Sequence, residues 1–387
     1  MRIKLQKSNK IVPQGATVLD LRTNEKEGLQ SLLSTLVKDF RFENFKTNVS
    51  KAKEEEIVVI TNHPEAVLSV QAIAEGIAYA RQLASLPPNL FSPVKLADKL
   101  KELIPLGIDV KILSAKDLKT IGMGALLAAG QGSINPPAVA ILSWKGRKQT
   151  PPLALVGKGV SFDSGGICLK SPLHQRPMKM DKSAAGVIAG VMKTLALIQS
   201  PEPVIGVLGF LENMPDGGAS RPGDVITTLS GQTVEIVDTD AEGRLLLADC
   251  MTYAIDTFSP SALIDLGTLT KEIFASLGTE CAGLYTENKA LEKTLLMASA
   301  SSGERLWPLP MGPYFAKQIE SEIADMQNSG IDGCGENGAC AEFLKKFSQK
   351  IPWAHIDLSG ASWNEKGPTG FGVHLLTHLT QTEWRFG

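Results

Sequence analysis

The chain has 387 residues, of which 43% are hydrophobic, 21% are charged and 6% are aromatic. This composition supplies enough apolar side chains for a sizeable core and excludes a disordered protein. Thirty-nine basic and 41 acidic residues give a net charge of -2, which argues against a dedicated binder of nucleic acid or of anionic membranes.

The N-terminal segment, MRIKLQKSNKIVPQ, lacks the apolar run of a signal peptide. No later stretch reaches about 18 uninterrupted apolar residues, the length that a membrane-spanning helix needs. We therefore expect a cytoplasmic protein that does not span a membrane. At roughly 100–200 residues per domain, the length allows two or three domains.

Residues 1–62 predict a small α/β domain, because the apolar runs Thr17–Leu21 and Ile57–Ile60 are separated by mixed charges. From Pro64 to about Ala84, apolar residues recur at helical spacing, and LPPN ends the pattern. We assign residues 63–88 to a connecting helix and residues 89–387 to a larger catalytic domain.

In this larger domain an apolar run, a glycine-rich turn and a helix follow one another repeatedly. The predicted strands are Val139–Trp144, Leu153–Val156, Val204–Leu211, Val234–Val237, Leu263–Leu266 and His355–Leu358. The predicted helices are Ser183–Ile198, Arg244–Ile255, Ala339–Phe347 and Val373–Leu379. This alternation indicates an α/β fold with a mostly parallel, helix-covered mixed sheet, whose ligands bind at the carboxyl ends of the strands.

Cysteine and histidine usage limits the kinds of metal site. The five cysteines are odd in number and contain no CxxC pair, which argues against a disulfide framework or a thiolate zinc site and favours a reducing compartment. The five histidines form no HExxH motif, so a catalytic metal would be held mainly by oxygen. We expect His355 and His374, which follow apolar patterns, to serve packing.

The segment LALVGKGVSFDSGG places polar residues directly after an apolar run. Lys158 lies between Gly157 and Gly159, and Asp163 follows five residues later. A turn with a surface lysine and a loop-capping aspartate would explain this segment equally well. The spacing of a phosphate-binding loop, GxxxxGK[ST], is absent, so that interpretation is weak.

Two further clusters stand at predicted helix starts. Lys170 precedes a loop that ends in Asp181, just before the helix at Ser183. Asp240, Glu242 and Arg244 open the next helix. Helix capping and the helix dipole would also account for carboxylates at these places. They do not account for Arg244, because a cation is disfavoured in the first turn.

The combination favours a metal centre. Four carboxylates are expected at strand ends or helix starts of one sheet: those of Asp163, Asp181, Asp240 and Glu242. Lys158, Lys170 and Arg244 are expected in the same places. Carboxylates that converge at low dielectric repel one another, and bound cations are the usual remedy. We expect a dinuclear site for Mn²⁺, Mg²⁺ or Zn²⁺, with ions roughly 3.5–4 Å apart. A coordinating lysine must be neutral, which a neighbouring dication can enforce.

At these residues the sequence closely resembles the leucyl (cytosol) aminopeptidase family of dinuclear metallopeptidases. The resemblance spans about residues 80–380 and is carried by VGKGVSFDSGG (156–166), by LKSP and MKMD (169–181) and by the DTDAEGRL core within residues 212–250. It implies that an N-terminal residue, often Leu or another apolar residue, is removed from peptide substrates. It also implies two divalent metal ions per subunit, Mn²⁺ or Zn²⁺, and a homohexamer.

The resemblance assigns roles residue by residue. The implied metal ligands are Lys158, Asp163, Asp181, Asp240 and Glu242, of which Asp163 and Glu242 would bridge the ions. Lys170 and Arg244 match the family's two catalytic positions that bind no metal. Lys170 would stabilise the developing oxyanion, and Arg244 would hold a bicarbonate that shuttles protons. Leu266, Gly267 and Thr268, at the end of the LIDLGTLT strand, are candidates for binding the substrate backbone.

The sequence departs from the family pattern in three places. Position 238 is Asp where the family most often has Asn, and KSAAG follows Asp181 in place of a commoner MGGAA-like form. The stretch GCGENGAC at 333–340, which includes Glu336, is unlike the family's Gly/Ala-rich pattern. We interpret this stretch as a variable surface or oligomer loop.

Two other functions stay open at this point. A dinuclear phosphoesterase would show a similar sheet and similar carboxylates, but it would rarely need a lysine ligand. A DNA-binding hexamer is the second, because some relatives bind DNA independently of peptidase activity. The net charge of -2, and a charge of only +3 over residues 1–60, argue against this role.

Overall fold

The computed structural model describes residues 2–6, 17–48, 56–330 and 334–382. Its centre is an eight-stranded sheet with the order β12-β11-β14-β10-β6-β7-β5-β4. In chain order these strands are β4 (Asp109–Ser114), β5 (Ala138–Trp144), β6 (Leu153–Asp163), β7 (Val204–Asn213), β10 (Ala262–Gly267), β11 (Cys281–Tyr285), β12 (Arg305–Pro308) and β14 (Trp353–Asp357). The four central strands, β14, β10, β6 and β7, run parallel, whereas β5 and β11 pair antiparallel with β7 and β14. The mostly parallel mixed sheet predicted from the sequence is confirmed.

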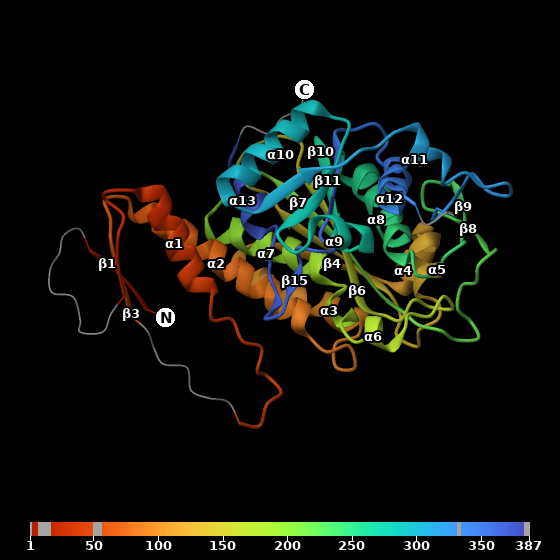
Figure 1. Ribbon diagram of the computed structural model, residues 1–387, viewed down its shortest axis with the longest axis horizontal. Coiled ribbons are helices and arrows are strands. Elements are labelled where there is room, and N and C mark those ends of the chain that lie inside the picture. The colour runs from red at the N-terminus through yellow and green to blue at the C-terminus, as the bar shows by residue number, and fades with distance from the viewer. Residues whose placement is uncertain (1, 7–16, 49–55, 331–333, 383–387) are drawn as a thin grey trace.

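Helices cover both faces of this sheet (Figure 1). One face packs against α2 (Pro64–Ser85), α3 (Pro93–Lys99), α7 (Ser183–Leu197), α10 (Lys289–Ser302) and α13 (Val373–Gln381). The other packs against α4 (Ala115–Ile121), α5 (Gly124–Gly130), α8 (Glu242–Phe258) and α12 (Glu336–Lys345). Successive residues of β6 alternate between the two layers: Leu153 and Leu155 face the first, and Ala154 and Val156 the second. The strands are apolar on both sides because both sides are buried.

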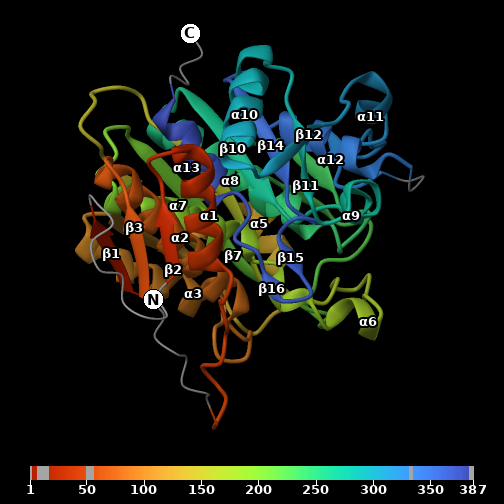
Figure 2. The ribbon, with the colours of Figure 1, turned by 60° about the vertical axis from the view of Figure 1, so that its left-hand side comes forward.

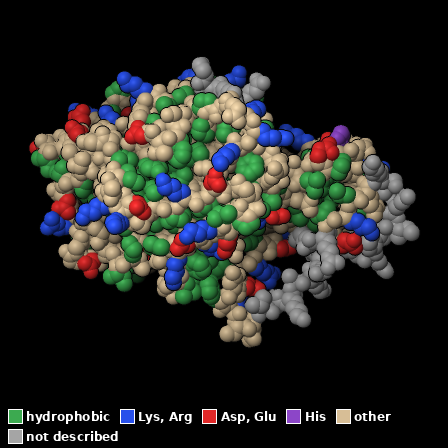
Figure 3. All heavy atoms as spheres, turned by 180° about the vertical axis from the view of Figure 1, so that it is seen from behind, with side chains coloured by type: hydrophobic (Ala, Val, Ile, Leu, Met, Phe, Trp, Pro, Cys, Tyr) green, Lys and Arg blue, Asp and Glu red, His purple; other side chains and the backbone are tan. Residues whose placement is uncertain are grey.

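A smaller three-stranded sheet stands at the N-terminal end. It consists of β1 (Arg2–Gln6), β3 (Glu56–Ile60) and β2 (Thr17–Asp20), all parallel, and it packs with α1 (Glu25–Val37) and the first turns of α2 around Leu32, Val59 and Val67. Figures 1 and 2 show α2 running from this sheet into the main body, and Figure 3 shows the smaller lobe beside it. A small N-terminal α/β unit joined by a helix is therefore present, while the exact boundaries at residues 62 and 88 stay a prediction.

The remaining elements are short. A second small sheet has the order β13-β9-β8, and a two-stranded sheet pairs β15 with β16. Their bounds are β8 (Val225–Thr227), β9 (Thr233–Glu235), β13 (Met326–Gln327), β15 (Trp363–Asn364) and β16 (Gly367–Pro368). The short helices are η1 (Leu100–Leu106), α6 (Pro172–Gln175), η2 (Met178–Met180), α9 (Lys271–Leu277) and α11 (Pro313–Lys317). None of the described helices is both long and apolar enough to cross a bilayer.

Two sequence-based strand predictions need correction. The run at Val234–Val237 forms β9, which lies in the small sheet and not in the large one. The strand at Leu153 does not end at Val156 but continues as β6 to Asp163. Gly157 and Gly159, which suggested a turn, are instead strand residues that lie close to neighbouring atoms. A Cβ on Gly159 would lie 2.6 Å from the Gly209 carbonyl oxygen. Lys158 is therefore a strand residue.

The two histidines expected to serve packing lie in the interior. His355 is 1% exposed on β14 and its Nδ1 lies 2.6 Å from Asp265 Oδ1. Its ring stacks on Tyr285 at a centroid distance of 5.9 Å. His374 is 8% exposed and its ring lies beside that of His378 on α13. These contacts place both side chains in the packing of β14 and α13.

Helices α2 and α7 touch backbone to backbone. A Cβ on Gly190 would lie 2.4 Å from the Gly76 carbonyl oxygen, and a Cβ on Gly76 would lie 2.6 Å from that of Gly190. Because α7 begins two residues after Asp181, this contact fixes the helix that follows a candidate site residue.

We predict that Gly190→Ala lowers the free energy of unfolding by about 1–3 kcal/mol, because overpacking forces the two helices apart. Urea unfolding followed by circular dichroism measures the effect. Gly217→Ala is the control, since nothing lies within 4 Å of a Cβ at that position, and it should change stability by less than about 0.5 kcal/mol. Equal stability of the two variants would contradict the close helix contact.

Candidate metal centre

The candidate residues converge at the carboxyl ends of the central strands. Lys158 and Asp163 lie on β6, whose register shifts between Val160 and Asp163. After Asp163 the chain turns sharply through Gly165 and Gly166, whose φ values are 91° and 67°. A Cβ on Gly165 would lie 2.4 Å from the Cys168 carbonyl oxygen, so only glycine permits this turn. The turn brings Lys170 back over the end of β6.

Three carboxylates are crowded together in the interior. Asp163, Asp181 and Glu242 each offer an oxygen, and these oxygens all lie within 4.8 Å of one another. Their exposed fractions are 2%, 4% and 1%. Three negative charges at such distances and with so little water repel strongly unless cations lie between them.

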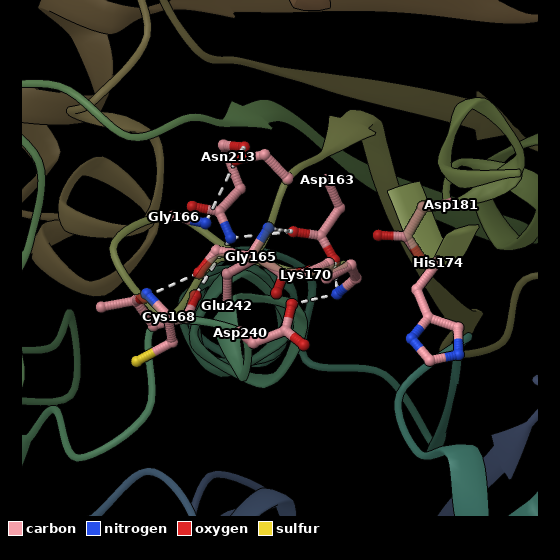
Figure 4. A network of polar contacts seen from close by, with 12 residues as sticks. Asp163, Gly165, Gly166, Cys168, Lys170, His174, Asp181, Asn213, Asp240 and Glu242 are labelled. Atoms are coloured by element: carbon pink, nitrogen blue, oxygen red, sulfur yellow. Dashed lines mark hydrogen bonds and ion pairs between the residues drawn. The ribbon is translucent and has the colours of Figure 1, made fainter. Parts of the chain in front are cut away.

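Two lysines supply positive charge to this cluster. The Lys158 ammonium lies 2.8 Å from Asp181 Oδ2 and 2.9 Å from Glu242 Oε1. The Lys170 ammonium lies 2.5 Å from Asp163 Oδ2 and also pairs with Asp240. Figure 4 shows the carboxylates of Asp163 and Asp240 directed at Lys170. The five predicted ligands and Lys170 therefore form one charged network.

The surroundings shift the pKa values of these groups. Burial raises the pKa of Asp181, Asp240 and Glu242, and the Asp163 charge raises each further. Burial alone would lower the pKa of Lys158, but Asp181 and Glu242 outweigh it and raise this pKa. Burial likewise opposes the charge of Lys170, and Asp163 raises the pKa of its ammonium. The raised carboxyl pKa values mean that the charged forms of these acids are disfavoured despite the two lysines, and a bound dication would relieve that repulsion.

The residues present fit a divalent metal. Neither side-chain oxygen of Glu242 has a hydrogen-bond partner in the part of the chain that the structure describes, although Oε1 faces the Lys158 ammonium. A buried carboxylate oxygen without a partner is costly, and a metal ion would satisfy it. The Lys158 ammonium has no lone pair, so it would coordinate only after a bound dication had displaced its proton. Carboxylate oxygens with one such amine nitrogen suit Mn²⁺ or Zn²⁺.

Helix capping does not explain these carboxylates. The N-cap of α7 is Lys182 and that of α8 is Ala241, and neither makes a side-chain capping bond. Asp181 instead accepts a 2.6 Å hydrogen bond from the Thr268 hydroxyl. The capping alternative left open by the sequence is therefore wrong for Asp181 and Asp240.

Arg244 lies apart from the carboxylate cluster although it belongs to the same helix start. It is 3% exposed, its Nη1 donates to the Asn328 carbonyl oxygen at 2.8 Å, and the same nitrogen lies 2.6 Å from Glu336 Oε1. Glu336 belongs to the 333–340 stretch, of which residue 333 lies outside the described residues. The interpretation of this stretch as a variable surface or oligomer loop is wrong from Glu336 onward, because these residues form α12 and Glu336 contacts a buried arginine.

The three candidate substrate-binding residues do not all lie in the charged network. The side chain of Leu266 is fully buried in the apolar core, and Gly267 ends β10. Thr268 follows directly, and its carbonyl oxygen accepts a 2.9 Å hydrogen bond from Lys158 Nζ. Since its hydroxyl also reaches Asp181, Thr268 belongs to the charged network and Leu266 does not.

Sequence reasoning missed Asn213 in this network and the buried Lys182, which follows Asp181 in the chain. Asn213 ends β7, and its side-chain amide donates to Asp163 Oδ1 at 2.9 Å and to the Thr239 carbonyl oxygen at 3.0 Å. Lys182 is 1% exposed, and burial lowers its pKa to about 7. A polar residue at the end of an apolar strand was the available signal for Asn213, whereas Lys182 resembles an ordinary helix-start lysine.

Comparisons with known proteins show which family the chain resembles. Residues 78–377 match the catalytic domain of the cytosol aminopeptidase family. The chain is 40% identical over 381 residues to a probable cytosol aminopeptidase of Rhizobium johnstonii, covering 94% of this chain and 77% of that protein. It is 42% identical over 369 residues to one of Agrobacterium fabrum, covering 91% and 74%. Among solved structures, the bottromycin maturation enzyme BotP in complex with Mn superposes with a TM-score of 0.87 at 31% identity, covering 95% of this chain and 84% of that one.

We predict that Glu242→Gln weakens the binding of divalent metal by more than about tenfold. Substituting a residue that only hydrogen-bonds to a metal ligand already costs about tenfold in affinity, and losing a ligand should cost more. Elemental analysis after dialysis measures the bound metal, and circular dichroism checks the fold. Glu212→Gln is the matched control, because Glu212 accepts hydrogen bonds from Ser133 and Asn135 outside the cluster. Full metal content in the Glu242 variant would remove this residue from the ligand set.

Proposed function

The chain belongs to the cytosol aminopeptidase family and is a metallo-aminopeptidase, a hydrolase, and we propose that it uses two divalent ions to remove Leu and other apolar N-terminal residues from peptides. The observation that carries this proposal is the buried cluster of Asp163, Asp181 and Glu242, which only cations make tolerable. Family membership favours a peptide substrate over a phosphoester.

Five side chains would hold the ions: Lys158, Asp163, Asp181, Asp240 and Glu242. When bound, two dications would supply Lewis acidity toward the scissile carbonyl and would lower the pKa of an attacking water to near neutrality. The Mn bound in the BotP complex supports a divalent ion at such a site. Manganese and zinc are the two candidates that the donor set favours.

Lys170 would supply a positive charge close to the carbonyl oxygen of the substrate. Its ammonium is held charged by Asp163 and Asp240, which raise its pKa against the effect of burial. An ammonium fixed beside the ligands can stabilise the negative charge that develops on the carbonyl oxygen during attack by water. Thr268, which contacts both Lys158 and Asp181, is the strongest of the three candidates for contact with the substrate backbone.

Location and assembly belong to the same proposal. The word cytosol in the names of the relatives supports a cytoplasmic enzyme. A homohexamer, as the family resemblance implies, is expected, and light scattering after size-exclusion chromatography measures it. We propose no nucleic-acid partner, in line with the net charge of -2.

Metal removal tests the proposed chemistry. We predict that the chelated protein loses hydrolysis of Leu-p-nitroanilide and that Mn²⁺ or Zn²⁺ restores it, with activity rising until two equivalents are bound. Isothermal titration counts the ions and anomalous scattering at the metal edges identifies them. N-acetyl-Leu-p-nitroanilide is the control substrate, since an aminopeptidase requires a free α-amine. Full turnover of the chelated protein, or hydrolysis of the acetylated substrate, would refute the proposal.

We predict that Lys170→Ala lowers kcat by about 100- to 1,000-fold, the usual cost of removing one group that stabilises an oxyanion, while both metal ions stay bound. Steady-state kinetics and elemental analysis give the two readouts. Lys145→Ala, at a lysine whose side chain is 84% exposed, should retain full turnover. Loss of metal in the Lys170 variant would make Lys170 a ligand instead.

A further inference from the structure

Arg244 already has a carboxylate partner from its own chain. The guanidinium is 3% exposed, and its Nη1 lies 2.6 Å from Glu336 Oε1, on a side chain that is 15% exposed. Charge-assisted contacts of this length are among the stronger polar interactions in proteins. Because both groups are largely withdrawn from water, the pair is much less screened than a surface ion pair.

Glu336 is held in place from several sides. Its Oε1 accepts a 2.9 Å hydrogen bond from the Ser329 hydroxyl, and its Oε2 accepts a 2.8 Å bond from the Gly330 backbone N–H. It also lies in the first turn of α12, where a carboxylate is favoured by the helix dipole. Both carboxylate oxygens thus have donors in addition to Arg244, so the side chain is fixed where it meets the guanidinium.

A second acid of this chain acts on the same arginine. Asp238 lies next to Asn328, which accepts from the backbone N–H groups of Val237 and Asp238 and whose carbonyl oxygen accepts from Arg244. Burial would lower the pKa of Arg244, but the charges of Glu336 and Asp238 contribute to raising it. Of the two departures from the family pattern, Glu336 contacts the guanidinium directly, whereas the Asp238 carboxylate accepts a hydrogen bond from the Asp240 backbone N–H and adds its charge without a contact.

A further anion would meet unfavourable conditions beside Arg244. It would have to displace the Glu336 carboxylate, which would then lose its ion pair while remaining bonded to Ser329 and Gly330. If it bound without displacing Glu336, it would lie next to the Glu336 carboxylate at low dielectric, where like charges repel. Breaking one partner out of a buried ion pair is strongly unfavourable.

We propose that Glu336 is the resident anion of Arg244, a positioning residue that takes the place at the guanidinium otherwise open to a small solute carboxylate such as bicarbonate. The binding part of this inference stands on the geometry alone. Its consequence for turnover rests on the proposed function, in which Arg244 serves the aminopeptidase reaction. In this protein the carboxylate is covalently supplied, so turnover does not depend on dissolved bicarbonate.

Binding is tested first, without any measurement of activity. ¹³C-labelled bicarbonate is titrated into the wild-type protein, Glu336→Ala and Glu336→Gln, and line broadening reports bound anion. We expect saturable binding only to Glu336→Ala, which leaves Arg244 unpaired and vacates the space of the side chain. The glutamine variant keeps that space filled. Bicarbonate binding to the wild type with the same affinity as to Glu336→Ala would overturn the proposal.

Turnover of Leu-p-nitroanilide in carbonate-free buffer gives the second test. We expect the wild type to be unaffected by added bicarbonate, and Glu336→Ala to lose at least about tenfold in kcat and to regain it with bicarbonate or formate. Glu336→Gln should be impaired and not rescued. Glu342→Gln is the matched control: Glu342 is a buried carboxylate of the same helix that accepts from the Gly312 N–H, and it should show no anion response.

The outcomes separate the two proposals. A wild type that requires bicarbonate for turnover would overturn the role of Glu336 while leaving the aminopeptidase assignment intact. A wild type without any aminopeptidase activity would refute the proposed function, and the binding titration would still decide the role of Glu336. If Glu336→Ala does not fold, the wild-type titration and the wild-type response to bicarbonate decide it alone.

Discussion

The structure depends on one electrostatic constraint, the confinement of three carboxylates within 4.8 Å of one another in the protein interior. Such a cluster cannot be stable by itself, since each charge is both desolvated and repelled by its neighbours. Every feature around it relieves part of this cost. Lys158 and Lys170 pair with the acids, and the Thr268 hydroxyl and the Asn213 amide donate to them. A bound metal ion would relieve the electrostatic repulsion that these donors do not offset.

The parallel strands explain how residues so distant in sequence can meet. Strands β6, β7, β10 and β14 end at the same edge of the sheet, so Asp163, Asn213 and Thr268 arrive there from three separate segments. Helices α7 and α8 begin at this edge and bring Asp181 and Glu242. Their first residues serve the site rather than the helices, which is why neither helix has a side-chain cap.

Sequence reasoning predicted the parts of this arrangement that depend on local pattern. Long Val/Ile/Leu runs marked β5, β7, β10 and β14, and acids after such runs marked the candidate ligands. It misplaced Lys158 because Gly157 and Gly159 suggest a turn, whereas they make room for Ile188 and for the Gly209 backbone. Strand β11, CAGLY, has small residues and no apolar run, and α1 lies among mixed charges, so neither gave a signal. The pairing of Arg244 with Glu336 joins two helices far apart in the chain, and no local pattern reports such a contact.

Because β6 extends through Lys158, strand pairing holds one part of the site, and the other part lies on a loop. Lys158 and Asp163 are strand residues hydrogen-bonded within the sheet, with Lys158 opposite Gly209, and they can move only if strand pairing breaks. Lys170 stands on the loop between β6 and α7, which presents Leu169 and Leu173 to solvent. Substitutions in that loop can therefore shift Lys170 without breaking the strand pairing that holds Lys158 and Asp163, although Asp181 lies at the end of the same loop. Evolution or engineering can therefore change the substrate range more readily through the loop than through the strand.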